Sequence, residues 1–174
     1  MRPEIRARLI PTHKAQPIFS RMAILGHPLH PMLIHFPVAA LMSVIATDLA
    51  YVFTADDFWA RAGLWLTGVG ALGGWVSGTA GLVDLVSVPR IRRLIAAWCH
   101  AIFAVMLLSL ATLNWLLRVG EPAAQIWPWG LYLSLFCGAL ITITGVLGGR
   151  LVYEFAVGVD TDHEAKKSWP SRED

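Results

Sequence analysis

The stretch GLWLTGVGALGGWVSGTAGLVDL, residues 63–85, decides the fold of this chain. Small or polar side chains recur along it with alternating spacings of four and three residues, which places them on one helix face. They are Gly63, Thr67, Gly70, Gly74, Ser77, Gly81 and Asp84. Small residues at this period let helix backbones approach closely in lipid. The stretch therefore predicts a membrane helix that packs tightly against other helices.

The composition extends this prediction to the whole chain. The 174 residues are 56% apolar and 15% charged, with a mean hydropathy of +0.57, which is too apolar for an ordinary soluble domain. Four tracts come close to the ~20 residues that cross a hydrocarbon core, at roughly 32–53, 62–86, 94–117 and 129–147. Short connections require neighbouring helices to run antiparallel. We expect an all-α integral membrane protein, an antiparallel up-down four-helix transmembrane bundle.

The basic residues predict the orientation of the bundle. They gather before the first tract, between the second and third, and after the fourth, while only Arg61 and Arg118 occupy the other two connections. The positive-inside rule then places both termini of a multi-pass bacterial inner-membrane protein in the cytoplasm. We expect a basic cytoplasmic segment at 1–26, the transmembrane domain at 27–159 and a disordered cytoplasmic tail at 160–174. We find no internal sequence repeat.

Four histidines lie near one end of these tracts: His27, His30, His35 and His100. Titratable side chains at membrane depth are costly, so a group of four indicates a functional site. We favour His35 and His100 as ligands, because they are surrounded by apolar residues a turn or two below the interface, where they could face each other. For His27 and His30 we favour helix capping or placement at the headgroup layer over ligation.

Prolines shape the start of the first tract. Pro28 and Pro31 suit the beginning of a helix, where a missing N–H costs nothing. Pro37 cannot donate to the carbonyl of Leu33, so it should kink or restart the helix just after His35. A bent entry of this kind could turn the histidines inward.

Two acidic residues lie within the tracts. Asp84 has two open roles: orienting a metal-bound imidazole, or the structural role of capping the helix end or pairing with Arg90 or Arg93. Asp48 lies near the outer end of the first helix, where we expect it to pair with Arg61 or to reach water. We assign no function to Asp48.

Several motifs together resemble a known family. The opening GHPLHPMLIHFPVAAL, the second-tract ending SGTAGLVDLVSVP, the histidine-led third tract and the closing GVLGGRLVYEFAVGV are similar to bacterial membrane proteins of domain-of-unknown-function family 2231. The resemblance covers about residues 24–160. It implies a small helical inner-membrane protein, and relatives joined to Rieske or cytochrome-type domains imply redox work. Where relatives carry a histidine after the Tyr of the closing motif, this chain has Glu154 and Phe155.

Three functions fit these features. The first is a b-type haem protein that transfers electrons, with two histidine ligands and a basic rim of Arg92, Arg93 and Arg150 near the haem propionates. The second is a non-haem Zn, Cu or Fe site that uses the histidines with Asp84 or Glu154. The third is a structural or accessory subunit without a cofactor. We favour the first, which describes an electron carrier or redox subunit more than a stand-alone enzyme.

The candidate site and partners follow from these alternatives. The cofactor-binding candidates are His35, His100, His30, His27, Asp84, Arg93 and Arg150, and the four histidines are the candidate metal ligands. Expected partners are membrane lipid and a redox protein such as a Rieske or cytochrome protein, with a second copy of the chain left open. We do not expect nucleic-acid binding, because topology explains the basic residues. Hydrolase motifs such as HExxH are absent from the sequence.

Overall fold

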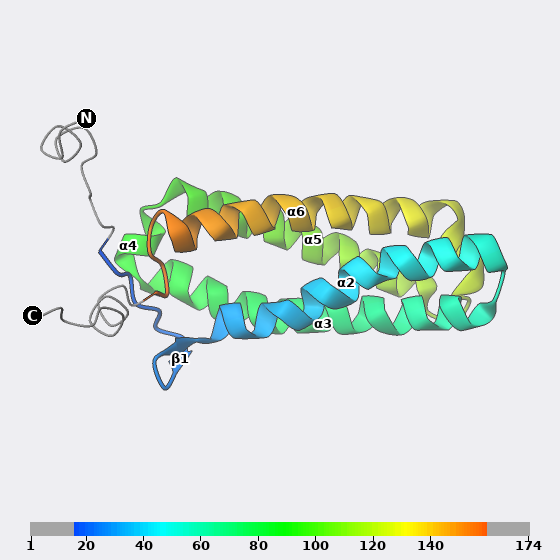
Figure 1. Cartoon of the computed structure of the whole chain (residues 1–174), viewed down its shortest axis with the longest axis horizontal. Coiled ribbons are helices and arrows are strands. Elements are labelled where there is room, and N and C mark those ends of the chain that lie inside the picture. The colour runs from blue at the N-terminus through cyan, green and yellow to red at the C-terminus, as the bar shows by residue number, and fades with distance from the viewer. Residues whose placement is uncertain (1–15, 160–174) are drawn as a thin grey trace, which may run out of the picture.

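The computed structural model describes residues 16–159. Its four long helices are α2 (Leu29–Thr54), α3 (Asp57–Ser87), α5 (Ile95–Arg118) and α6 (Leu131–Tyr153). Each helix is long and apolar enough to cross a membrane, the fourth together with the turn that precedes it. The predicted all-α class with four membrane-length helices is therefore confirmed. Figure 1 shows the helices side by side and alternating in direction along the chain.

Short elements connect the long helices. They are the two-stranded antiparallel hairpin of β1 (Ala23–Ile24) and β2 (His27–Pro28), the helix α4 (Pro89–Arg92), and the turns η1 (Ala123–Gln125) and η2 (Ile126–Gly130). The connection between α2 and α3 is only Ala55 and Asp56. Ala55 takes the left-handed conformation, φ 53°, and Asp56 caps α3 by accepting from the Phe58 N–H at 2.8 Å. This cap starts α3 several residues before the predicted tract.

The first helix differs from its prediction at one point. α2 begins after Pro28, as predicted, but it continues through Pro37 without a break. The ring of Pro37 packs on Gly73 of α3, where a Cβ would lie 3.6 Å from the proline Cβ. The helix is continuous at this point, and the predicted restart after His35 is wrong.

The helices form a four-cornered bundle. α2 packs against α3 and α6, and α5 packs against the same two helices, so α2 and α5 lie diagonally opposite each other. All four helices contribute to one buried apolar cluster, Leu41, Ala71, Leu107, Ala111, Cys137, Leu140 and Ile141. Residues that meet across the α2–α5 diagonal therefore lie in the bundle interior.

Glycines bring α3 close to its neighbours, as the opening stretch predicts. A Cβ at Gly70 would lie 2.5 Å from Leu41 Cγ, and one at Gly74 would collide with Leu108. The sequence of the last tract predicts a second row of small or polar residues, but two of its members, Thr142 and Gly145, are exposed. The predicted row is Ser134, Gly138, Thr142, Gly145 and Gly149. The buried face of α6 instead follows Ser134, Gly138, Ile141 and Thr144.

The two ends of the described chain close one end of the bundle. The Ile18 N–H donates to Ala156 O at 3.0 Å, and the Gly158 N–H donates to Ile18 O at 2.8 Å. Ile18 is buried in a cluster with Leu85, Ile91 and Ala97. The predicted basic segment thus packs on the bundle from residue 16 onward. Residues 1–15 and the predicted disordered tail at 160–174 lie outside the described residues.

Candidate functional site

Two of the four candidate histidines meet across the bundle. His30 lies in the first turn of α2 and His100 in the second turn of α5. Their ring centroids are 6.1 Å apart, and the ring planes are inclined at 85°. Because α2 and α5 are diagonal, the pair lies between α3 and α6. We call this part of the molecule the histidine end.

A backbone carbonyl holds each ring at Nδ1. His30 Nδ1 lies 2.9 Å from Ser77 O on α3, and His100 Nδ1 lies 3.0 Å from Thr144 O on α6. A carbonyl oxygen only accepts, so each Nδ1 carries the proton and donates it. In a neutral ring this leaves the lone pair on Nε2, which is the arrangement typical of metal-binding histidines.

The two Nε2 atoms are available to a ligand. Neither makes a hydrogen bond within residues 16–159, and in that part of the chain no buried side-chain nitrogen or oxygen is left without a partner. Both Nε2 atoms are therefore accessible and are not enclosed by packed side chains. Both rings are only partly buried, in contrast to the fully enclosed residues of the core.

A glycine lies under each ring. A Cβ at Gly81 would be 3.1 Å from His30 Nδ1, and a Cβ at Gly148 would be 3.2 Å from His100 Cε1. Both distances are tighter than ordinary van der Waals contact. Glycine at these two positions thus lets the rings lie directly against the backbones of α3 and α6.

The other two histidines lie away from the pair. His35 is exposed, and five residues of α-helix separate its direction from that of His30 by about 140°. His27 is also exposed, and its Nδ1 lies 3.0 Å from Leu25 O in the β1–β2 turn. The structure therefore brings His30, rather than the expected His35, to His100.

Asp84 takes neither of its predicted roles. Its carboxylate accepts hydrogen bonds from the Ser20 hydroxyl, from the Arg21 N–H at 2.8 Å and from the Met22 N–H at 3.0 Å. These are its partners within the described chain, and the side chain is buried by them. Asp84 attaches residues 20–22 to the end of α3.

The candidate arginines lie at the same end without touching the rings. Arg150 forms a half-exposed ion pair with Glu154 at 3.0 Å, and this hydrogen bond lowers the pKa of the Glu154 carboxyl. Arg93 is exposed at the end of α4. Arg90 donates to the carbonyls of Gln16 and Pro17, so it supports the terminal segment.

The structure also reveals a buried ion pair at the opposite end of the bundle. Arg118 Nη1 and Nη2 donate to the two carboxylate oxygens of Asp48 at 2.6 and 2.7 Å, and both side chains are fully enclosed. Arg118 Nε donates to Asn114 Oδ1 at 3.0 Å, and the Ser134 hydroxyl donates to Asp48 Oδ2 at 2.6 Å. Every polar atom of this cluster is satisfied, so it forms a closed network.

The sequence analysis missed this ion pair. The sequence places Arg118 in an outer connection and predicts that Asp48 pairs with Arg61 or reaches water. Arg118 is instead the last residue of α5 and lies one turn after Asn114, on the buried face that also holds Leu107 and Ala111. The spacing of four residues between Asn114 and Arg118 is the sequence signal that could have placed both on one helix face.

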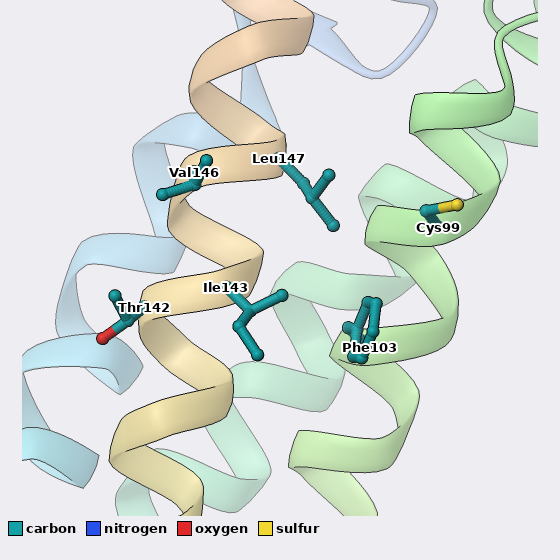
Figure 2. Close-up of a pocket in the computed structure, with 6 residues that line it drawn as sticks. All are labelled: Cys99, Phe103, Thr142, Ile143, Val146 and Leu147. Atoms are coloured by element: carbon teal, nitrogen blue, oxygen red, sulfur yellow. The ribbon is translucent and has the colours of Figure 1, made fainter.

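Figure 2 shows an apolar groove beside the histidine end. Cys99 and Phe103 of α5 lie on one side of it, and the other side is formed by Thr142, Ile143, Val146 and Leu147 of α6. Its volume is about 390 Å³. Neither paired histidine lines this groove. Among residues 16–159, no group of three or more His, Cys, Asp or Glu side chains is placed to hold a metal ion.

One comparison with known proteins identifies a relationship. A family model described as "Predicted membrane protein (DUF2231)" matches residues 26–161. No curated protein and no solved structure matches the chain. The matched range contains all four long helices, the histidine pair and the buried ion pair.

Proposed function

This chain belongs to the DUF2231 family of predicted membrane proteins, and from that premise we propose that it is a small electron-transfer protein that binds haem b through His30 and His100. One observation carries the proposal. The two rings face the bundle interior from diagonally opposite helices, 6.1 Å apart, each with Nδ1 on a carbonyl and Nε2 free. Interiors of helical bundles are common sites for such cofactors.

The ring spacing suits one metal ion between the histidines. Two imidazoles that bind one ion, with each nitrogen about 2.0–2.1 Å from it, would have ring centres no more than about 6.5 Å apart. The observed 6.1 Å agrees with this requirement. When bound, haem iron would supply reversible one-electron chemistry.

The small number of protein ligands favours haem over a bare ion. Zinc sites in proteins use three or four protein ligands. The described residues bring only two histidines together, with no third His, Cys, Asp or Glu beside them. A porphyrin would supply the remaining ligands itself, so His30 and His100 would be sufficient to hold it. Gly81 and Gly148 let the two rings lie directly against the backbones of α3 and α6.

The other residues at this end would support the cofactor indirectly. The carbonyls of Ser77 and Thr144 fix the protonation and orientation of the rings, which tunes a bound metal. Arg93 is an exposed cation at the same end and is the better remaining candidate for a propionate, since Arg150 is already paired with Glu154. Asp84 is no longer part of the proposed site.

The proposal includes a location and partners. The basic residues support an inner-membrane protein whose termini are cytoplasmic. Residues 16 and 159 lie at the histidine end (Figure 1), so electrons would be exchanged near the cytoplasmic face. A Rieske or cytochrome protein is the expected partner, and self-association is an open alternative. Reporter fusions to each terminus, active on the cytoplasmic side only, would support this orientation, and periplasmic activity would contradict it.

The test is a spectrum of protein purified in mild detergent from haem-replete cells. We expect a sharp α band in the dithionite-reduced minus oxidised spectrum and near-stoichiometric haem b by pyridine haemochrome. His30→Ala and His100→Ala should each lower bound haem ~10-fold or more, because each removes an axial ligand. His35→Ala, on the same helix as His30 but exposed, is the matched control and should keep the wild-type spectrum.

Other outcomes would redirect or remove the proposal. If the protein contained a stoichiometric metal without a macrocycle, the proposed ligand at the same histidines would be a bare metal ion instead of haem. A wild-type spectrum in both His30→Ala and His100→Ala would reject this ligand pair. Absence of haem and of metal from the wild-type protein would leave a structural role.

A further inference from the structure

α3 and the segment from η2 into α6 share a sequence pattern. Residues 63–81 read GLWLTGVGALGGWVSGTAG, and residues 130–148 read GLYLSLFCGALITITGVLG. At a constant offset of 67 positions, GLWLT aligns with GLYLS, and SGTAG aligns with TGVLG. The statement that the chain has no internal repeat is therefore wrong. The central part of the two segments has diverged, which hides the match.

The aligned positions make the same contacts at the histidine end. The carbonyl of Ser77 holds His30, and the carbonyl of its counterpart Thr144 holds His100, at 2.9 and 3.0 Å. Four residues after each of them a glycine, Gly81 or Gly148, lies against the same ring. We call each set of one carbonyl and one glycine a histidine seat.

The correspondence continues to the other end of the bundle. Thr67 Oγ1 lies within hydrogen-bond distance of Gly63 O, and Ser134 Oγ lies 2.9 Å from Gly130 O. A Cβ at Gly63 would lie 2.9 Å from Arg118 Nη1, and one at Gly130 would lie 3.0 Å from Arg118 Nη2. The two equivalent glycines thus flank one guanidinium.

The spacing between the polar residues is also the same in α2 and α5. Asp48 follows His30 by 18 residues, and Arg118 follows His100 by 18 residues. Both pairs, His30 with His100 and Asp48 with Arg118, join α2 to α5 across the diagonal. A pseudo-twofold axis along the bundle therefore passes between the two rings and between the two ions.

We propose that α2–α3 and α5–α6 are two copies of one helical hairpin, and that each copy contributes an equivalent histidine seat to one site on the pseudo-twofold axis. Ser77, Gly81, Thr144 and Gly148 are then positioning residues, which set the protonation and place of the ligating rings. The ligand is one whose two sides are alike, namely a metal ion or a planar tetrapyrrole. Only this ligand class depends on the proposed function.

Glycine substitutions test the seats. A Cβ at Gly81 or Gly148 would press on its ring, so Gly81→Ala should perturb His30 and Gly148→Ala should perturb His100. Gly78→Ala and Gly145→Ala are matched controls from the same two motifs. A Cβ at Gly78 makes ordinary contact with Leu108 at 3.4 Å, and one at Gly145 meets open space.

The readout is ¹⁵N NMR of histidine-labelled, metal-free protein in detergent, with signals assigned by His30→Asn and His100→Asn. We expect the Nδ1–H tautomer at both rings of the wild type, a shift or loss of one signal in each seat variant, and no change in either control. An Nε2–H tautomer at either wild-type ring would overturn the proposal, even if the glycine variants fail to fold. A response confined to one hairpin would also overturn it.

A second measurement separates this proposal from the proposed function. The same four glycine variants are purified from haem-replete cells, and their reduced spectra are compared. Matched spectral changes in Gly81→Ala and Gly148→Ala, with wild-type spectra in the controls, would support a ligand on the axis. Wild-type protein without haem or metal but with the expected tautomers would reject the ligand and retain the duplicated seats.

Discussion

Asp48 and Arg118 are two residues that together determine the buried structure at the end of the bundle opposite the histidine end. A charged side chain in a membrane helix is costly unless it is paired. Here the carboxylate accepts hydrogen bonds from two N–H groups of one guanidinium and from one hydroxyl, and no buried side-chain nitrogen or oxygen in residues 16–159 is left without a partner. The same two ions would be unstable if either were present alone.

We therefore predict a non-additive response to substitution of the ion pair. Arg118→Met leaves a buried carboxylate without its partner and should lower the free energy of unfolding by about 3–5 kcal/mol. The double variant Asp48→Leu/Arg118→Met removes both charges and should lose less than Arg118→Met alone. Thermal unfolding in detergent, followed by circular dichroism, measures both. Asp57→Asn, an exposed residue of α3, is the control, and equal losses in the single and double variants would contradict the prediction.

For the histidines, the direction of each side chain around the helix axis decides which of them meet. His30 and His35 are on one helix and only five residues apart, yet one ring faces the interior and the other is exposed. The sequence identified the group of histidines correctly as a set near one end. It could not select the pair, because hydropathy indicates depth along a helix and says little about rotation around it.

At the scale of helices, glycine positions control how closely α3 approaches its neighbours. Gly70 lies over the Cγ atom of Leu41, near the centre of the apolar core. Gly145 of α6 is a glycine of the same kind in sequence, but no atom lies within 4 Å of a Cβ placed there. Two glycines in similar membrane helices therefore differ in how closely neighbouring atoms approach them.

We predict opposite signs for alanine at these two glycines. Gly70→Ala should destabilise the protein by about 1–3 kcal/mol, because Leu41 Cγ would have to move and the overpacking exceeds the gain in helix propensity. Gly145→Ala has no steric cost and should change stability by zero to about +1 kcal/mol, the propensity gain alone. Thermal unfolding of the two variants in the same detergent measures the difference. Equal midpoints would show that the α2–α3 contact is looser than described.

The helices themselves were predictable in number and approximate position. Their length and hydropathy are local properties of the chain, and the four predicted tracts all lie within or close to the observed helices. The errors come from residue-level contacts. Pro37 lies inside a continuous α2, where its ring packs on Gly73, and α3 starts early because Asp56 caps it.

At the scale of the whole molecule, one acidic residue attaches the terminal segment to the bundle. Asp84 accepts hydrogen bonds from three consecutive residues, 20–22, at the end where the histidines lie. The parallel contact of Ile18 with Val157 joins the same segment to the residues that follow α6. This end is thus closed by contacts between distant parts of the chain.

We predict that Asp84→Ala releases this segment. Hydrogen bonds to a charged group contribute about 1.5–3 kcal/mol each, so loss of three of them should speed cleavage by trypsin after Arg21 by ~10-fold or more. Limited proteolysis with mass spectrometry of the fragments measures the rate. Glu121→Ala, an exposed acid in the connection after α5, should leave the rate unchanged. An unchanged rate in Asp84→Ala would mean that the terminal contacts with Ala156 and Gly158 are sufficient.

The sequence by itself determined the membrane-length helices, the close-packed glycine face of α3 and the concentration of histidines at one end. These features follow from local spacing and hydropathy, which a chain carries before it folds. Only the tertiary structure decided that His30 meets His100, that Asp48 meets Arg118 and that Asp84 holds residues 20–22. Each of these contacts joins separate segments, and each depends on the rotation and diagonal placement of whole helices, which are set by the packing of all four together.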